Sequence, residues 1–157
     1  MYIRVDTTQQ KLTLINNGDI LLSFSISTGK NGTGSQAGSE CTPKGWHVVR
    51  EMIGKDEPEN RVFEGRRPID LICNEKTFAE HPGRDWILTR ILWLSGLDDD
   101  KNRFHPVDTH RRFIYIHGTP DWTPLGVPGS RGCIRMKNKA LIALYTKIIP
   151  GTRVYIN

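Results

Sequence analysis

Hydrophobic positions along this chain gather in short β-type runs separated by turns rich in glycine, proline and asparagine, which predicts a protein built mainly of strands. Two such runs, residues 11–15 and 19–27, flank Asn16-Asn17-Gly18. Asn-Gly between β-rich runs predicts a tight hairpin turn. Further strands are expected at residues 46–53, 86–94, 113–116 and 152–156.

Only the segment after Asn138 has clear helical spacing, and Asn138 is the expected N-cap of that helix. Pro150-Gly151 ends it. The apolar residues at intervals of three or four are Leu141, Leu144, Tyr145 and Ile148. A length of 157 residues suits one domain with a real core.

The mid-chain region carries little periodicity. Residues 54–83 hold three prolines and several glycines, which predicts an irregular excursion over one face. We expect the wider region 54–108 to cover a substrate. The predicted fold is therefore a single mainly β domain over residues 1–157, with a minor α component. It is a mixed sandwich or barrel with one helix near the C-terminal end and a long mid-chain loop excursion.

Composition narrows the class of protein. Hydrophobic residues make up 37% and charged residues 25%, as in a soluble globular domain. No apolar run is long enough to span a bilayer. Residues 1–11 show no basic region, apolar region or cleavage site of a signal peptide, so we expect a cytoplasmic protein, or a periplasmic one if the native start lies upstream. The net charge of +5 favours anionic partners.

The cysteines and histidines favour reduced thiols and no metal site. Cys41, Cys73 and Cys133 form an odd set without CxxC spacing, which argues against a disulfide framework. The five histidines lack the HxH or HExxH spacing of metal ligands. We therefore expect no metal and no other cofactor.

The strongest chemical signal is His117-Gly118-Thr119 followed by Ser130-Arg131-Gly132-Cys133-Ile134-Arg135-Met136. A thiol is a strong nucleophile only as thiolate, and a nearby histidine is the usual means of producing it. We therefore expect Cys133 to be the nucleophile and His117 the general base and acid. A backbone carbonyl such as that of Gly118 is expected to orient the ring.

The residues around Cys133 suit acyl transfer. Gly132 leaves room for a substrate, so its N–H and that of Cys133 can face a developing oxyanion, where one donor contributes roughly 3 kcal/mol. Arg135 lies on the same side as Cys133 in an extended run and can bind a carboxylate with two hydrogen bonds. Each residue alone is more often structural than catalytic. Their combination is what indicates an enzyme.

These motifs resemble the L,D-transpeptidase catalytic domain. The resemblance includes Ser27-Thr28-Gly29-Lys30, Thr42-Pro43-Lys44-Gly45 and the C-terminal helix and strand, so it covers essentially the whole chain. It implies a mixed β-sandwich and a cysteine acyl-enzyme that acts on peptidoglycan stem peptides and is sensitive to carbapenems. It further implies that Cys133 attacks the carbonyl of the third residue, usually meso-diaminopimelate, and expels the terminal D-alanine.

One position departs from the family pattern. Many relatives carry histidine where this chain has Arg131, and arginine cannot act as a base at neutral pH. We expect Arg131 to position a substrate carboxylate or stabilise the thiolate. Ser130 and Thr119 are expected to shape the substrate-binding loops by hydrogen bonding, and Trp122 to lie near the mouth of the site.

The acyl acceptor decides the reaction. With water, the enzyme is an L,D-carboxypeptidase that trims tetrapeptides for murein recycling in the cytosol, which we favour. With a second stem's amine, it is an L,D-transpeptidase that forms 3-3 cross-links in the cell wall. The expected partners are stem peptides or muropeptides, with no nucleic acid and no membrane. A remote alternative is a non-catalytic domain that binds wall or nucleic acid, although no RNA-binding motif is present.

Overall fold

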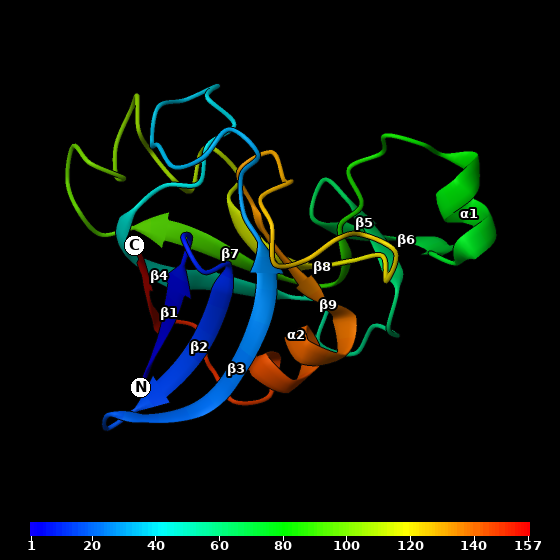
Figure 1. Ribbon diagram of the computed structural model, residues 1–157, viewed down its shortest axis with the longest axis horizontal. Helices are drawn as coiled ribbons and strands as arrows, with labels where there is room; N and C mark the ends of the chain where they lie inside the picture. Colours follow the sequence, from blue (N-terminus) through cyan, green and yellow to red (C-terminus); the bar gives the residue numbers. More distant parts are fainter.

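The computed structural model describes residues 1–157. Ten strands form one sheet in the order β4-β10-β1-β2-β3-β9-β8-β7-β5-β6, and pairing of β4 with β7 closes the first part of that order into a barrel (Figure 1). The strands are β1 (Tyr2–Asp6), β2 (Lys11–Asn16), β3 (Asp19–Ser27), β4 (Gly45–Ile53), β5 (Arg61–Glu64), β6 (Arg67–Ile72), β7 (Leu88–Gly96), β8 (Tyr115–Thr119), β9 (Ile134–Lys137) and β10 (Arg153–Ile156). The helices are α1 (Glu75–Glu80) and α2 (Asn138–Tyr145).

The fold confirms the prediction of a mainly β barrel or sandwich, and the expected hairpin is present. β2 and β3 pair in antiparallel fashion on either side of Asn17 and Gly18, whose φ angles are 50° and 87°. Two positive φ angles are what a tight hairpin turn between twisted strands requires. No helix of the structure is long and apolar enough to cross a membrane.

The mid-chain excursion contains more regular structure than the sequence indicated. The segment 54–83 forms the β5–β6 hairpin and the short helix α1, so the molecule has two helices rather than one. α1 buries none of its residues, and reciprocal hydrogen bonds between Asn74 and Thr77 cap its start. A helix of this length without an apolar face leaves no periodicity to detect.

The start of α2 also differs from the expectation. Asn138 is the first residue of the helix rather than its N-cap, which is Lys137 without a side-chain hydrogen bond. The Asn138 side chain is fully buried and bonds instead to other elements. Its Nδ2 donates to the carbonyl oxygen of Thr119, and its Oδ1 accepts from the hydroxyl of Thr89. The Asn138 side chain could cap the helix locally, but it forms hydrogen bonds to other elements instead.

The sheet has two covered faces. Side chains such as Ile116 and Ile134 point into the barrel, where they share one core with the apolar side of α2. Tyr115 and Cys133 belong to a second cluster on the other face, together with Phe63 of β5. Figure 1 shows β5, β6 and α1 to one side of the barrel, beside β7 and β8. This second layer covers the strands that carry the candidate residues.

Candidate active site

Strand register brings His117 and Cys133 to the same face of the sheet. β8 and β9 run parallel, with His117 beside Arg135. Cys133 directly precedes β9, and the backbone N–H of Tyr115 donates to its Sγ at 3.3 Å. Because residues two apart on a strand share a face, His117 and Cys133 are diagonal neighbours. The tertiary structure thus places the imidazole near the thiol.

His117 is held as a neutral base. Only 1% of the residue is exposed, and its Nδ1 lies 2.8 Å from the carbonyl oxygen of Gly118. This contact places the ring proton on Nδ1, and the buried Nε2 has no hydrogen-bond partner. Burial lowers the pKa of His117, and this effect outweighs the Gly118 hydrogen bond and the nearby carboxylate of Asp85. Nε2 is therefore free to accept a proton.

Cys133 is a neutral thiol in this arrangement. Its Sγ accepts from the N–H of Tyr115 and lies 3.3 Å from the carbonyl oxygen of Phe113. Burial raises the pKa of Cys133 to about 12, more than the Tyr115 hydrogen bond and the cations of Arg135 and Arg112 lower it. Burial thus opposes charge on both groups, and it favours a neutral thiol beside a neutral imidazole.

The loop before Cys133 is held by its own hydrogen bonds. The N–H of Gly132 donates to Ser130 Oγ at 3.1 Å, and the Ser130 hydroxyl donates to the carbonyl oxygen of Cys133. Gly132 has φ 115°, and a Cβ there would lie 3.0 Å from the carbonyl oxygen of Cys41, so only glycine fits. We expected the Gly132 N–H to face an oxyanion. In this structure the Gly132 N–H donates to Ser130 Oγ instead, whereas the backbone N–H of Cys133 has no acceptor within the protein.

Two early segments that carry the family resemblance support this loop. The Thr42 hydroxyl donates to the carbonyl oxygen of Gly132 at 2.9 Å and accepts from the N–H of Gly29 at 2.8 Å. The N–H of Lys30 donates to the carbonyl oxygen of Ser130 at 2.8 Å. These contacts join residues distant in sequence directly to the loop that precedes Cys133. They explain physically why the early segments accompany the cysteine motif.

A charged cavity of about 340 Å³ lies beside the catalytic loop. Arg135 pairs with Asp85 at 2.9 Å, and Arg131 is exposed, with Nη2 3.4 Å from the carbonyl oxygen of Gly83. Cations outnumber carboxylates, so the cavity suits an anion. Its lining contains no hydrophobic residue and consists of Lys30, Asn31, Glu40, Gly83, Arg84, Asp85, Gly129, Ser130, Arg131 and Arg135.

The remaining predicted residues lie less directly at the reacting groups. Thr119 is buried at the end of β8, two residues after His117, and its carbonyl oxygen accepts from Asn138. Trp122 is 48% exposed and stacks on Phe78 of α1, with ring centroids 5.4 Å apart. Thr119 thus anchors the strand that carries His117. Trp122 connects the following loop to the second layer.

The structure also brings in residues that the sequence did not single out. Asp85 and Arg112 both influence the charge of Cys133, and Arg112 Nη2 donates to the carbonyl oxygen of Cys41 at 2.7 Å. Arg66 donates to the Tyr115 hydroxyl at 3.2 Å. None of the three lies near the cysteine motif in sequence. Arg66 and Arg112 each belong to a pair of adjacent arginines outside any motif, and Asp85 carries no motif signal.

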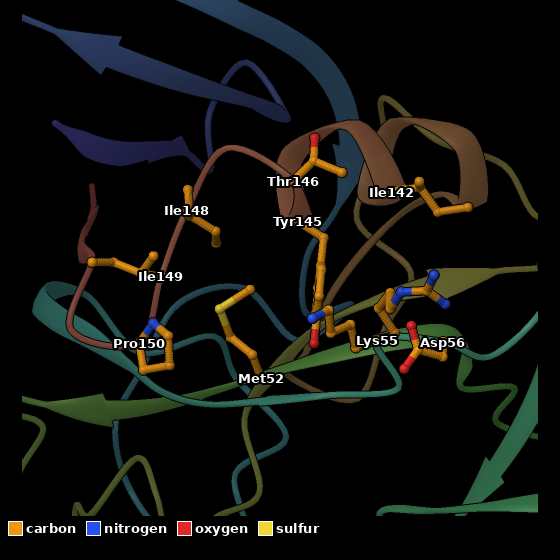
Figure 2. A pocket seen from close by; sticks show the side chains of 10 residues that line it. Met52, Lys55, Asp56, Ile142, Tyr145, Thr146, Ile148, Ile149 and Pro150 are labelled. Atoms are coloured by element: carbon orange, nitrogen blue, oxygen red, sulfur yellow. The ribbon is translucent and has the colours of Figure 1, made fainter.

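A larger cavity of about 530 Å³ lies apart from this site (Figure 2). It opens between α2, the segment after it and the end of β4, and it contains neither His117 nor Cys133. The residues that line this second cavity are Met52, Lys55, Asp56, Arg90, Ile142, Tyr145, Thr146, Ile148, Ile149 and Pro150.

Nowhere in the structure are three or more histidine, cysteine, aspartate or glutamate side chains grouped so that they could hold a metal ion.

Comparison with known families gives a match along the chain. A model of the L,D-transpeptidase catalytic domain, the YkuD family, matches residues 1–156. No match is found among curated proteins. Of the structures with this fold, an L,D-transpeptidase from Xylanimonas cellulosilytica DSM 15894 is 18% identical with a TM-score of 0.57. The alignment covers 99% of this chain and 59% of that chain.

Two further structures have the same fold. The catalytic domain of the Enterococcus faecium L,D-transpeptidase is 19% identical with a TM-score of 0.56, and the alignment covers 99% of this chain and 95% of that one. L,D-transpeptidase 3 from Mycobacterium tuberculosis, in complex with a faropenem-derived adduct, is 14% identical with a TM-score of 0.60. Here the alignment covers 99% of this chain and 59% of that one. At such low identity, these structures establish a shared fold.

Proposed function

Because the chain belongs to the L,D-transpeptidase catalytic-domain family, which consists of cysteine enzymes, we propose that it cleaves peptidoglycan tetrapeptide stems. The bond cleaved is the L,D bond between residue 3, diaminopimelate, and the terminal D-alanine. One observation carries the proposal. The unpartnered Nε2 of His117 lies on the same covered face as the Cys133 thiol, and Cys133 is two residues before Arg135, the register partner of His117.

Acylation begins with the neutral pair. As Cys133 Sγ bonds to the carbonyl carbon of residue 3, the thiol proton moves to His117 Nε2. The negative charge passes to the carbonyl oxygen, where the free Cys133 N–H can donate a hydrogen bond. The bond between the carbonyl carbon and nitrogen then breaks, and His117 returns the proton to the departing amine. D-Alanine leaves, and a thioester remains on Cys133.

We propose water as the second acceptor. His117 takes a proton from water as its oxygen attacks the thioester, and the proton then restores the Cys133 thiol. The three free cysteines, which suit a reducing compartment where soluble wall fragments are the substrates, support this choice. The proposed activity is therefore L,D-carboxypeptidase, with the formation of 3-3 cross-links as the competing outcome.

The surrounding residues take supporting roles in this proposal. Ser130 fixes the Gly132–Cys133 backbone, and the Gly118 carbonyl orients the His117 ring. Arg131, at the rim of the charged cavity, binds an anionic part of the stem. Thr119 holds the end of β8, and Trp122 contributes an exposed ring for substrate contact.

We propose the cytosol as the compartment and soluble muropeptides as the substrates. All three cysteines are free in the structure, and a reducing compartment keeps thiols in that state. Peptide trimming in that setting serves the recycling of wall fragments.

Replacement of the nucleophile tests the enzymatic role. We expect Cys133→Ala to lower turnover of a disaccharide-tetrapeptide by at least about 10³-fold while the fold is kept, because no other group can form the thioester. The readout is loss of one D-alanine by mass spectrometry. Cys41→Ser is the matched control, since it removes another partly exposed thiol, and it should remain active. Equal turnover by Cys133→Ala and the unaltered enzyme would refute the proposal.

The same assay distinguishes the two acceptors. Conversion to a disaccharide-tripeptide supports hydrolysis, and a dominant dimer would overturn the carboxypeptidase assignment. Reaction with a carbapenem supplies a separate test of the thiol, because related structures include one with imipenem and one with a faropenem-derived adduct. We expect one drug molecule to add to the intact protein and none to Cys133→Ala.

A further inference from the structure

Two buried polar atoms at the site lack partners within the protein: His117 Nε2 and Arg135 Nε. The two residues are register partners on the adjacent parallel strands β8 and β9. Neighbouring strands lie about 4.8 Å apart, and both side chains point to the face that carries Cys133. A buried donor or acceptor without a partner costs free energy, so this pair is suited to a ligand with two polar groups close together.

Arg135 is only partly satisfied. Its Nη1 donates to the carbonyl oxygen of Gly129 at 3.0 Å, and its Nη2 donates to Asp85 Oδ1 at 2.9 Å. The side chain is 14% exposed. Asp85 therefore uses one of the two donors on this edge of the guanidinium and leaves Nε without an acceptor. A planar carboxylate placed on that edge would accept from both Nε and Nη2.

The proposed function supplies a ligand with the required chemistry. The departing residue is an α-amino acid, whose amine and carboxylate are attached to the same carbon. In the mechanism above, its amine receives a proton from His117 Nε2, so its carboxylate must lie within a few bonds of that ring. Arg135, beside His117, is the cation at that distance.

We infer that Arg135 binds the α-carboxylate of the departing residue, and that Asp85 holds the same edge of the guanidinium when no substrate is bound. This inference rests on the proposed function and adds to it the two residues that distinguish a free terminal carboxylate from an amide. A peptide bond or an amide at that position offers no negative charge, and it would leave Arg135 with Asp85. Arg131 and Lys30, in the same cavity, add to the attraction for a free terminus.

Two substrates test the inference directly. One is a stem tetrapeptide with a free terminal carboxylate, and the other is the same peptide ending in a carboxamide. We expect the enzyme to prefer the acid by about 10-fold to 100-fold in kcat/KM, the range typical of a hydrogen bond to a charged group. Arg135→Gln should bring the ratio close to one by slowing the acid alone. Arg153→Gln, which removes an exposed and distant cation, should keep the original ratio.

The variant Asp85→Asn should change the turnover of the acid in the opposite direction to Arg135→Gln. It tests the inference even if Arg135→Gln fails to fold. Removal of the competing carboxylate should raise kcat/KM for the acid several-fold, mainly through a lower KM, and leave the amide unchanged. If the ion pair were merely structural, both variants would slow both substrates equally.

Three outcomes overturn the inference. Equal cleavage of acid and amide by an active enzyme refutes it and leaves the proposed function intact. Equal slowing of both substrates by Asp85→Asn also refutes it, because the pair is then structural. Cleavage of neither substrate overturns the proposed function, and this inference with it.

Discussion

Burial opposes charge on both candidate reacting residues. It lowers the pKa of His117 and raises the pKa of Cys133, although several nearby groups favour the charged forms. A neutral thiol next to a neutral imidazole is less reactive toward adventitious electrophiles than a thiolate. In the proposed mechanism, the thiolate is therefore produced only when a bound carbonyl can accept the electrons.

Alkylation of Cys133 as a function of pH tests this view. Burial raises the pKa of the thiol to about 12, so the rate with iodoacetamide should rise about tenfold per pH unit from pH 7 to pH 10, without a plateau. Peptide mass spectrometry identifies the alkylated cysteine. The unfolded protein is the control, in which a thiol titrates near pH 8.5. A plateau below pH 8 would indicate a preformed imidazolium–thiolate pair instead.

Between elements, two contacts maintain the site. The first is Asn138 at the start of α2, which bonds to β7, to β8 and to the loop before β5. The approach is close: a Cβ on Gly118 would meet Asn138 Oδ1 and the carbonyl oxygen of Leu88. Glycine at position 118 therefore allows β7, β8 and α2 to meet directly behind His117.

We expect Asn138→Ala to lower the free energy of unfolding by about 3 kcal/mol, measured by urea denaturation. The change leaves the Thr119 carbonyl and the Thr89 hydroxyl buried without this partner, and each unsatisfied group costs about 1–3 kcal/mol. Lys139→Ala, at the next and exposed position, should change stability by less than about 0.5 kcal/mol. Equal effects of the two variants would show that the Asn138 network contributes little.

The second contact fixes the β5–β6 hairpin over the catalytic strand. Arg66, at the tip of the hairpin, donates to the Tyr115 hydroxyl at 3.2 Å. Its guanidinium also lies over two aromatic rings, 5.0 Å from the centroid of Trp93 and 4.8 Å from that of Phe113. The Phe113 carbonyl in turn contacts the Cys133 thiol. Arg66 therefore connects the second layer to the residues that surround the sulfur.

Removal of this contact should expose the thiol. We expect Arg66→Ala to increase the rate of Cys133 alkylation about tenfold at constant pH, because a hydrogen bond and two cation–π contacts together contribute 1–2 kcal/mol against opening. Arg67→Ala is the matched control, since Arg67 is exposed on the same hairpin and should have no effect. The same rate in both variants would show that the hairpin does not limit access.

At the scale of the whole molecule, the closed barrel also buries an ionisable group far from the cysteine in sequence. His47 of β4 is fully buried, and its ring contacts the carbonyl oxygen of Gly45 at 3.0 Å and the hydroxyl of Thr109 at 3.2 Å. Burial lowers the pKa of His47 from 6.5 to about 4, although the Gly45 hydrogen bond and Asp98 oppose the shift. Protonation of His47 therefore favours the unfolded state, so the folded protein should lose stability in acid.

The free energy of unfolding depends on pH because the pKa of His47 differs between the folded and unfolded states. Since the folded pKa of His47 lies below the unfolded one, its contribution to stability is present above pH 6.5 and is lost as pH falls toward 4. We expect the difference in unfolding free energy between the unaltered protein and His47→Gln to shrink by about 3 kcal/mol from pH 7 to pH 4. His81→Gln, an exposed histidine, should show no such trend. A constant difference for His47→Gln would contradict the assignment.

The sequence by itself determined the local features of this protein. The Asn17-Gly18 hairpin, the β run next to His117 and the Gly132-Cys133 pair can each be recognised within a few residues, although β8 continues past His117 to Thr119. Turn chemistry, side-chain alternation and the backbone freedom of glycine act over that range. The fold class and the identity of the family followed from such segments taken together.

Only the tertiary structure decided the contacts that give these segments their chemistry. Asp85 pairs with Arg135 because the loop before β7 lies next to β9. Asn138 does not cap α2 and forms hydrogen bonds to other elements instead. The Gly132 N–H bonds to Ser130, and burial makes His117 and Cys133 neutral. Long-range packing and loss of water depend on the whole fold, and no local pattern encodes them.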